Sequence, residues 1–389
     1  LNERDNVLIM RTFSKGYSLA GMRLGYLLGA ANLIKPIIEK TRDSYNIDAL
    51  SQAIGLAAIQ DQAYAESTWS AVRGLRDALY AALLQRGFGG PSSQTNFLFM
   101  DVPATGPSAL AKEIEKRGFS GIFGPSLGDS LALCNAIAMH TTDIMFGTSI
   151  TPIYTRNVAD FAQTAAFIHE ISGGRFRFGV GVSHAPAMNR LGVKTGKPLS
   201  DMRQFVADLH AVPRVGDLPP IVLASLRDKM IQLAQEVGGG MVFANGARSH
   251  MGHSLGNLDA ESRDNDNFFI GNMIPTCISE DKEAAAAINR KTLTSYAFLP
   301  NYRNYWKEAG YEEEMVGVEK ALADKDYDRV PGCLSDRWLA DTTLYGSANE
   351  VREGIEAWYE AGIKTPIIVP SSAQGGQMQA IQEFFDIWD

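Results

Sequence analysis

The feature that most constrains the fold is a regular alternation, from residue 120 onward, of short apolar runs and amphipathic helical stretches. The runs expected to be strands are 120–126, 143–150, 176–183, 219–225, 240–246, 267–275 and 365–371. The expected helices are 128–139, 157–171, 200–211, 226–237, 281–297 and 347–361. Because these strands are apolar on both faces, the pattern predicts an α/β fold with a parallel sheet buried by helices.

Seven such strands follow residue 119, and an eighth would close a (β/α)8 TIM barrel. The run "TNFLFMDV" (95–102), followed by an amphipathic helix at 107–118, stands where the first barrel strand is expected. We therefore predict that residues 95–102 pair within the barrel, beside the strands at 120–126 and 365–371. An open doubly wound sheet is the alternative, but no strand is followed by a GxGxxG turn that enters a helix.

The residues before this strand have a different pattern. "NVLIMRTF" (6–13) is an expected strand, and residues 31–43 and 49–85 carry apolar side chains at helical spacing. Residues 1–90 are therefore predicted to be a mainly helical appendage with a poorly buried face.

Charge and cysteine content exclude several classes of protein. The chain has 389 residues, a net charge of −8 and no basic cluster, which argues against nucleic-acid or membrane-surface binding. No apolar run is long enough to span a bilayer. Cys134, Cys277 and Cys333 lie far apart, so neither a disulfide framework nor a structural zinc site is expected, and a cytoplasmic location is predicted. His250 and His253 have metal-ligand spacing but no neighbouring carboxylate or cysteine cluster, so no metal is predicted.

Residues near the N-terminus carry the first resemblance. "LIMRTFSKGYSLAGMRLGYLLG", "DSYNIDALSQAIGLAAIQD" and "GPSSQTNFLFMDV" resemble class I/II pyridoxal-phosphate aminotransferases of the histidinol-phosphate type, over residues 5–102. By this resemblance Lys15 matches the Schiff-base lysine, while Ser14 and Arg23 match phosphate contacts. In such enzymes the glycine-rich phosphate loop and the aspartate on the pyridine nitrogen precede this lysine. Aminotransferase activity is therefore not expected of this chain alone.

A second resemblance covers residues 107–389. Its motifs include "TTDIMFGTSITPIYTRN", "ISGGRFRFGVGVSHAP", "PPIVLASLRDKMIQLAQEV" and "YGSANEVREGIEAWYEAGIKTPIIVP". They resemble the luciferase-like monooxygenases, which include oxidoreductases that use the deazaflavin coenzyme F-420 or FMN. The expected organisation is a fused chain with an aminotransferase-like remnant at 1–94 and a bacterial-luciferase type barrel at 95–389. Residues 95–118 form the junction and include the candidate first strand and helix.

Ligands of such barrels lie at the carboxyl ends of the strands, so the residues that close each apolar run are the candidate site. They are Thr148, Ser149, Gly181, Ser183, His184, Ala224, Ser225, Leu226 and Asn245. The resemblance implies that the Thr148–Ser149–Ile150 turn lies behind the flavin-type ring. It also implies that the turns at 181–183 and 225–226 face the cofactor tail. His184 is the candidate catalytic residue, as a proton donor to substrate, although an ordinary loop histidine is the alternative.

The predicted function is an oxidoreductase or monooxygenase that acts on a small organic substrate by hydride or oxygen transfer. The alternatives are a pyridoxal-phosphate aminotransferase completed by another chain, and an inactive fusion. The substrate, the choice between FMN and coenzyme F-420, and a homodimer are left open. The aromatic residues of 301–311 are expected either to wall a substrate pocket or to belong to the core.

Overall fold

A computed structural model describes residues 5–41, 46–101, 106–125 and 128–388. The chain divides into two compact units, residues 1–104 and residues 105–389. No helix in the described part of the chain is long and apolar enough to cross a membrane.

The first unit is a β-hairpin followed by helices. Strands β1 (Leu8–Thr12) and β2 (Gly25–Gly29) pair antiparallel. The helices are α1 (Ala31–Thr41), α2 (Ala49–Gln60) and α3 (Gln62–Leu84), with a short 3-10 turn, η1 (Ala20–Met22). Among the residues that the structure describes in this unit, the buried apolar side chains are Phe13 and Ala65, whereas Leu75 on α3 is 71% exposed. Much of its apolar surface is therefore uncovered.

The prediction that residues 95–102 form a barrel strand is wrong for the described residues 95–101. Asp101 instead makes an isolated antiparallel bridge with Gly89 inside the first unit. The reason is local, because side chains bond the backbone amides in this stretch. Ser93 Oγ accepts from the Thr95 amide at 3.0 Å, and Thr95 Oγ1 accepts from the Phe97 amide at 3.3 Å. Such turns compete with strand formation. Val102 lies outside the described residues.

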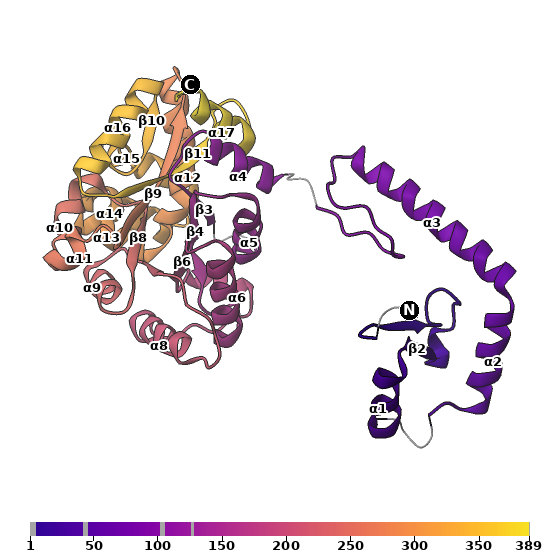
Figure 1. Ribbon diagram of the computed structural model, residues 1–389. Helices are drawn as coiled ribbons and strands as arrows, with labels where there is room; N and C mark the ends of the chain where they lie inside the picture. The colour runs from indigo at the N-terminus through magenta and orange to yellow at the C-terminus, as the bar shows by residue number, and fades with distance from the viewer. Residues whose placement is uncertain (1–4, 42–45, 102–105, 126–127, 389) are drawn as a thin grey trace. The chain divides into compact units, whose positions relative to one another are not determined.

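The second unit contains a curled parallel sheet of nine strands (Figure 1). The strands are β3 (Gly121–Pro125), β4 (Met145–Ser149), β5 (Thr151–Pro152), β6 (Phe176–Gly181), β7 (Ile221–Ala224), β8 (Gly240–Ala244), β9 (Phe269–Ile278), β10 (Leu344–Gly346) and β11 (Thr365–Ser371). The order is β3-β4-β6-β7-β8-β9-β10, with β11 also on β9 and β5 on β6. All the pairs in this sheet are parallel. The seven predicted strands are therefore confirmed, and β5 and β10 are short additions.

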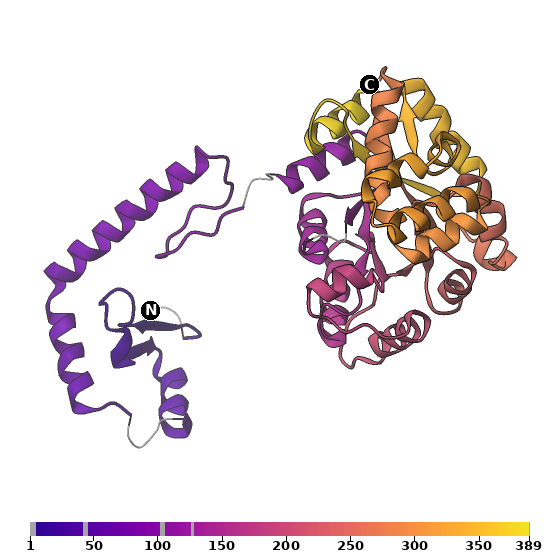
Figure 2. The same ribbon diagram turned by 180° about the vertical axis from the view of Figure 1, so that it is seen from behind.

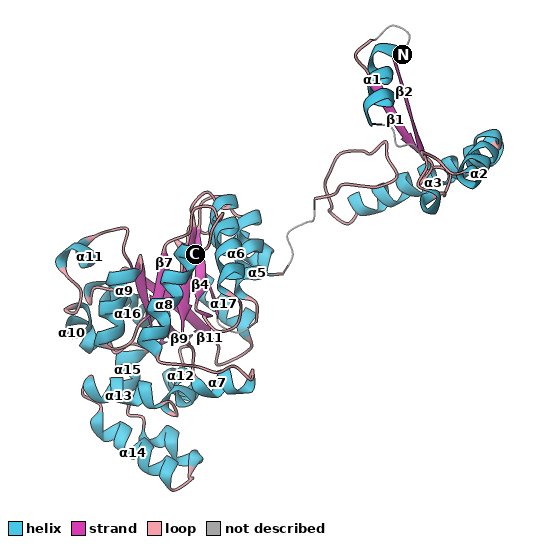
Figure 3. Ribbon diagram, turned by 90° about the horizontal axis from the view of Figure 1, so that it is seen from below, coloured by secondary structure: helices cyan, strands magenta, loops and turns pink. Residues whose placement is uncertain are grey.

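Helices surround this sheet (Figures 2 and 3). They are α4 (Pro107–Lys116), α5 (Ser130–His140), α6 (Val158–Ile171), α7 (Ala185–Arg190), α8 (Pro198–Ala211), α9 (Asp228–Val237), α10 (Met251–Leu255), α11 (Ala260–Asp264), α12 (Lys282–Ala297), α13 (Pro300–Glu308), α14 (Glu312–Ala323), α15 (Asp336–Thr342), α16 (Ala348–Glu360) and α17 (Gln377–Asp386). Two 3-10 turns, η2 (Arg248–His250) and η3 (Tyr327–Cys333), complete the unit. The main core lies between strands and helices and includes the fully buried Phe146, Phe161 and Phe178.

The sheet is open between β3 and β11, since no strand in the described part of the chain pairs with their outer sides. On β9, the backbone groups of Phe269 and Met273 make hydrogen bonds on the β8 side. The backbone groups of the residues that alternate with them, such as Asn272, therefore point toward β11. In a parallel ladder, a residue that bonds its neighbour lies opposite one that does not. Pro366 lies opposite Asn272, and the backbone groups of Pro366 and Pro370 therefore face the opening.

The other edge of the opening also carries a proline. Phe146 bonds on the β6 side of β4, so Ser149 bonds on the β3 side. Pro125 lies opposite Ser149, and its backbone therefore faces away from β4. Proline lacks an N–H donor and weakens an edge as a template for another strand.

Candidate active site

The end of β4 brings two of the predicted residues to the carboxyl side of the sheet. Thr148 is 2% exposed, and its hydroxyl donates to the carbonyl of Gly179 at 2.6 Å, so this group ties β4 to β6. The Ser149 hydroxyl is also buried and has no hydrogen-bond partner among the described residues. The peptide bond between Ser149 and Ile150 is cis. Ser149, and not Thr148, thus carries the unused donor at this strand end.

Three neighbouring strand ends meet at Gly181. A Cβ placed on Gly181 would lie 2.9 Å from the Ala224 Cβ and 2.9 Å from the Ile150 Cδ1. The structure therefore brings together Ile150, Gly181 and Ala224 from the ends of β4, β6 and β7. Gly179 is required for a different reason, since its Cβ would lie 1.8 Å from the carbonyl oxygen of Thr148. Both glycines are thus close-packing residues: Gly179 lies against a backbone carbonyl, and Gly181 lies against the side chains of Ile150 and Ala224.

Ser183 and His184 follow β6. Ser183 has a φ of 58°, in the left-handed region, and His184 is the residue before α7. The His184 ring makes edge contacts with Tyr296 and Tyr302, at centroid distances of 6.3 and 5.7 Å. Burial lowers the pKa of His184 below its ordinary value. A neutral imidazole is therefore favoured at this place.

In the turn after β7, the side chains of Ser225 and Leu226 are used in contacts within the protein, although they were expected to face a cofactor. The Ser225 hydroxyl is 3.3 Å from the carbonyl oxygens of Leu223 and Met230, and the residue is 3% exposed. Leu226 is half-buried and packs against the main core. The hydroxyl of Ser225 therefore bonds to the backbone around its own turn.

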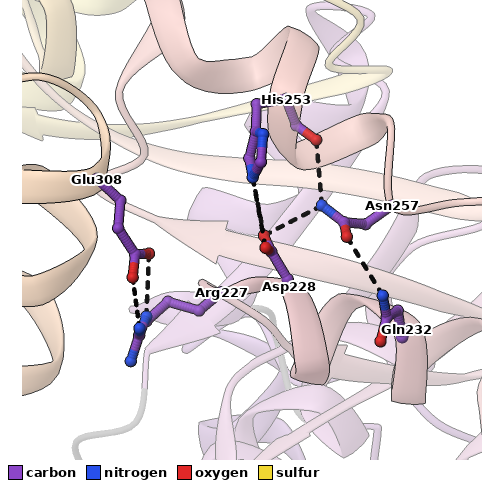
Figure 4. A network of polar contacts seen from close by, with 6 residues as sticks. All are labelled: Arg227, Asp228, Gln232, His253, Asn257 and Glu308. Carbon is purple, nitrogen blue, oxygen red and sulfur yellow. Dashed lines mark hydrogen bonds and ion pairs between the residues drawn. The ribbon is translucent and has the colours of Figure 1, made fainter.

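The residues that follow form a polar network on the surface (Figure 4). Arg227 forms a two-bond ion pair with Glu308 at the end of α13, with its Nε 3.0 Å from Oε2. Asp228 begins α9 and accepts from Asn257 Nδ2 at 3.0 Å. Its carboxylate also lies 3.2 Å from His253 Nε2. These contacts connect the end of β7 with α10 and α13.

The end of β8 carries Asn245, which is 3% exposed and has a φ of 57°. Its side-chain Nδ2 has no partner among the described residues. Its backbone carbonyl accepts from the indole N–H of Trp306 at 3.2 Å. Asn245 is therefore held by α13, with one buried donor left free.

The aromatic residues of 301–311, whose role the sequence left open between pocket wall and core, contact three of the strand-end turns or residues. Tyr302, Tyr305 and Trp306 are buried on α13 and contact, respectively, His184, the Ala247 amide and Asn245. Their spacing of three and four is typical of one helix face, but it did not distinguish a pocket wall from ordinary core. The structure places this face over the ends of β6 and β8.

His250 and His253 lie together, with ring centroids 4.7 Å apart. Within the part of the chain that the structure describes, no group of three or more histidine, cysteine or acidic residues has metal-binding geometry.

Comparison with known proteins bears on this site. The family model for luciferase-like monooxygenases matches residues 103–365, which is most of the chain. The chain belongs to the luciferase-like monooxygenase family.

Solved structures agree with the barrel fold of this family. The F420-dependent tetrahydromethanopterin reductase from Methanopyrus kandleri has a TM-score of 0.58 and 16% identity, with 73% of this chain and 95% of that chain covered. An F420-dependent secondary alcohol dehydrogenase, solved with an F420-acetone adduct, has a TM-score of 0.55 and 16% identity, with 73% and 94% covered. At these identities the likeness concerns the fold.

In the first unit, a cavity of about 510 Å³ lies beside the β1–β2 hairpin and is lined by Ser14 and Arg23. Ser14 Oγ accepts from Thr12 Oγ1 at 2.9 Å, and Arg23 donates to the carbonyl of Ala20 at 3.3 Å. The structure therefore brings together the two residues that the resemblance implied as phosphate contacts. Lys15 is exposed and does not line the cavity.

The family model for class I and II aminotransferases matches residues 1–119. Histidinol-phosphate aminotransferase from Microcystis aeruginosa is 38% identical over 117 residues, which cover 30% of this chain and 33% of that protein. The enzyme of the same name from Synechocystis sp. is 46% identical over 99 residues, with 25% and 28% covered. The chain thus spans about a third of the length of the curated relatives it matches.

Proposed function

We propose that the second unit is an oxidoreductase or monooxygenase that uses coenzyme F-420 or FMN on a small organic substrate. The observation that carries this proposal is the meeting of three strand ends at Gly181, where Ile150 and Ala224 pack so closely that there is no room for a Cβ. Glycine and alanine at the carboxyl ends of neighbouring parallel strands suit the close approach of a planar ring. The proposal includes a cytoplasmic location and leaves open a homodimer.

The residues present fit a flavin-type group. The buried Ser149 hydroxyl and the side-chain Nδ2 of Asn245 are polar groups without partners among the described residues. Buried polar groups are normally hydrogen-bonded, so an unpaired one in a site favours a bound ligand. Ser149, Ile150, Gly181 and Asn245 would hold the cofactor, which supplies hydride transfer or oxygen chemistry when bound.

His184 is the proposed residue that moves a proton on the substrate. Its lowered pKa favours the neutral ring, which carries one donor and one acceptor nitrogen. Tyr296 and Tyr302 restrict the orientation of that ring and exclude water from one side of it. In this role His184 exchanges a proton with substrate while Ser149 and Gly181 orient the cofactor.

Titration with reduced FMN and, separately, with reduced coenzyme F-420 tests this function. Binding of one of them near micromolar Kd, or about −8 kcal/mol, is expected and is measured by fluorescence quenching. Absence of binding of both at millimolar concentration would overturn the proposal.

A further inference from the structure

The turn that follows β8 is held by two consecutive side chains of α13. The carbonyl of Asn245 accepts from the indole N–H of Trp306 at 3.2 Å. Two residues later, the amide of Ala247 donates to the hydroxyl of Tyr305 at 3.0 Å. Tyr305 is 1% exposed and Trp306 is fully buried, so these bonds are formed away from water.

The same turn is also bonded from β9. The backbone amide of Asn245 donates to the carbonyl of Met273 at 3.0 Å, and the backbone amide of Gly246 donates to Asn272 Oδ1 at 3.2 Å. Both sides of the turn are therefore attached to buried structure. These bonds maintain the left-handed backbone of Asn245, a conformation that asparagine tolerates better than most residues.

One group at this turn is left over. The Nδ2 of Asn245 is buried and unpartnered among the described residues, although the backbone amide and carbonyl of the same residue are bonded. A buried donor without an acceptor carries a desolvation cost, which a bound acceptor removes. The turn thus holds a buried, unpaired side-chain donor at the carboxyl end of a barrel strand.

We propose that Trp306 is a positioning residue. By holding the backbone of Asn245, it places the side-chain amide of that residue, through Nδ2, for hydrogen bonding to an acceptor atom of the cofactor. This inference rests on the proposed function. It assigns to α13 a role in cofactor affinity, in addition to the wall that its Tyr302 forms against His184. Trp306 itself touches neither cofactor nor substrate in this role.

Trp338 provides a matched control. It is fully buried and packs at a right angle against Trp306, with ring centroids 4.8 Å apart, but its indole N–H has no partner in the described part of the chain. Trp306→Phe and Trp338→Phe therefore remove similar volume from the same core. Only the first removes a hydrogen bond to the Asn245 turn.

The first measurement needs no cofactor. In hydrogen exchange by mass spectrometry, Trp306→Phe is expected to speed exchange of peptides that contain residues 245–247, relative to Trp338→Phe of comparable melting temperature. The second measurement is the Kd of whichever cofactor the wild type binds. Trp306→Phe is expected to raise it about threefold to tenfold over Trp338→Phe, as for the loss of one hydrogen bond.

Equal exchange and equal Kd in the two variants would overturn the positioning role, even when the wild type binds cofactor. If the wild type binds neither cofactor, the proposed function fails, and the assignment of Asn245 to a cofactor fails with it. Faster exchange of 245–247 in Trp306→Phe would then identify a purely structural role for the indole N–H, which also contradicts the proposal.

Discussion

The ring of Tyr302 meets the ring of His184 edge to face, with centroids 5.7 Å apart and planes inclined at 61°. Tyr302 lies on α13, between β9 and β10 in the sequence, whereas His184 follows β6. The contact therefore joins α13 to the carboxyl end of β6. Because this packing removes water from the imidazole, it accounts for the lowered pKa of His184.

A lowered histidine pKa has a defined consequence for stability. Between the folded-state pKa and the unfolded value of about 6.5, the unfolded chain binds more protons. The free energy of unfolding therefore falls as the pH is lowered through this window. His184→Gln is expected to lose less stability than wild type between about pH 7.5 and about pH 5.5. Urea unfolding monitored by tryptophan fluorescence measures the difference.

Two other histidines also contribute to the pH dependence. Burial lowers the pKa of His169 and of His250, so the wild-type decline will exceed the part due to His184. Identical declines in wild type and His184→Gln would show that the imidazole has the same pKa in both states.

The two glycines of β6 are expected to respond differently to substitution. Gly179→Ala places a Cβ against a backbone carbonyl, and should destabilise the protein by at least about 2 kcal/mol. Gly181→Ala places its Cβ against side-chain atoms, so we expect a folded protein with weaker cofactor binding. Thermal unfolding and cofactor titration separate the two effects.

Gly252→Ala is the control, since the added Cβ would meet no atom within 4 Å apart from its own helix backbone and adjacent residues. Cofactor affinity in Gly181→Ala equal to that of Gly252→Ala would exclude the strand ends at Gly181 as a binding surface.

The prolines at the open edge are expected to limit strand addition. Replacing Pro366 and Pro370 with valine restores two N–H donors on the side of β11 that faces the opening. The double variant should form oligomers or aggregates at concentrations where wild type does not, as measured by light scattering. Thr365→Val, whose backbone groups face β9, should behave as wild type. An unchanged double variant would mean that other features protect this edge.

Lys15 is expected to have no special reactivity toward pyridoxal phosphate. It is exposed and lies outside the cavity that Ser14 and Arg23 line. Lys15→Ala should therefore leave the absorbance of a mixture with pyridoxal phosphate unchanged within error. A stable absorbance band that is lost in this variant would instead show that Lys15 forms a stable aldimine with pyridoxal phosphate.

Much of the barrel could be predicted because its signals are local. A strand buried on both faces must be apolar over its whole length, and the helices between strands carry one apolar stripe. This is why β4, β6 and β8 lie within the predicted runs. The carboxyl ends of parallel strands also meet at one edge, so Ser149, Gly181 and Asn245 could be named as candidates before their surroundings were known.

Other features depended on interactions between distant residues or on side-chain direction. The apolar run at 95–102 resembles a strand, yet Ser93 and Thr95 bond their own backbone and Asp101 pairs with Gly89. The hydroxyls of Thr148 and Ser225 turn toward protein carbonyls, which residue type does not indicate.

The local apolar pattern was sufficient to place seven of the strands and the helices between them, because burial on a repeating backbone requires a repeating apolar pattern. Which donor stays free at the strand ends depends instead on contacts between segments that are far apart in the sequence. Trp306 reaches Asn245 across 61 residues of chain, and Thr148 is separated from Gly179 by 31. Whether a polar group is satisfied depends on the atoms that folding brings within about 3 Å of it, and the order of residues along the chain does not specify those atoms.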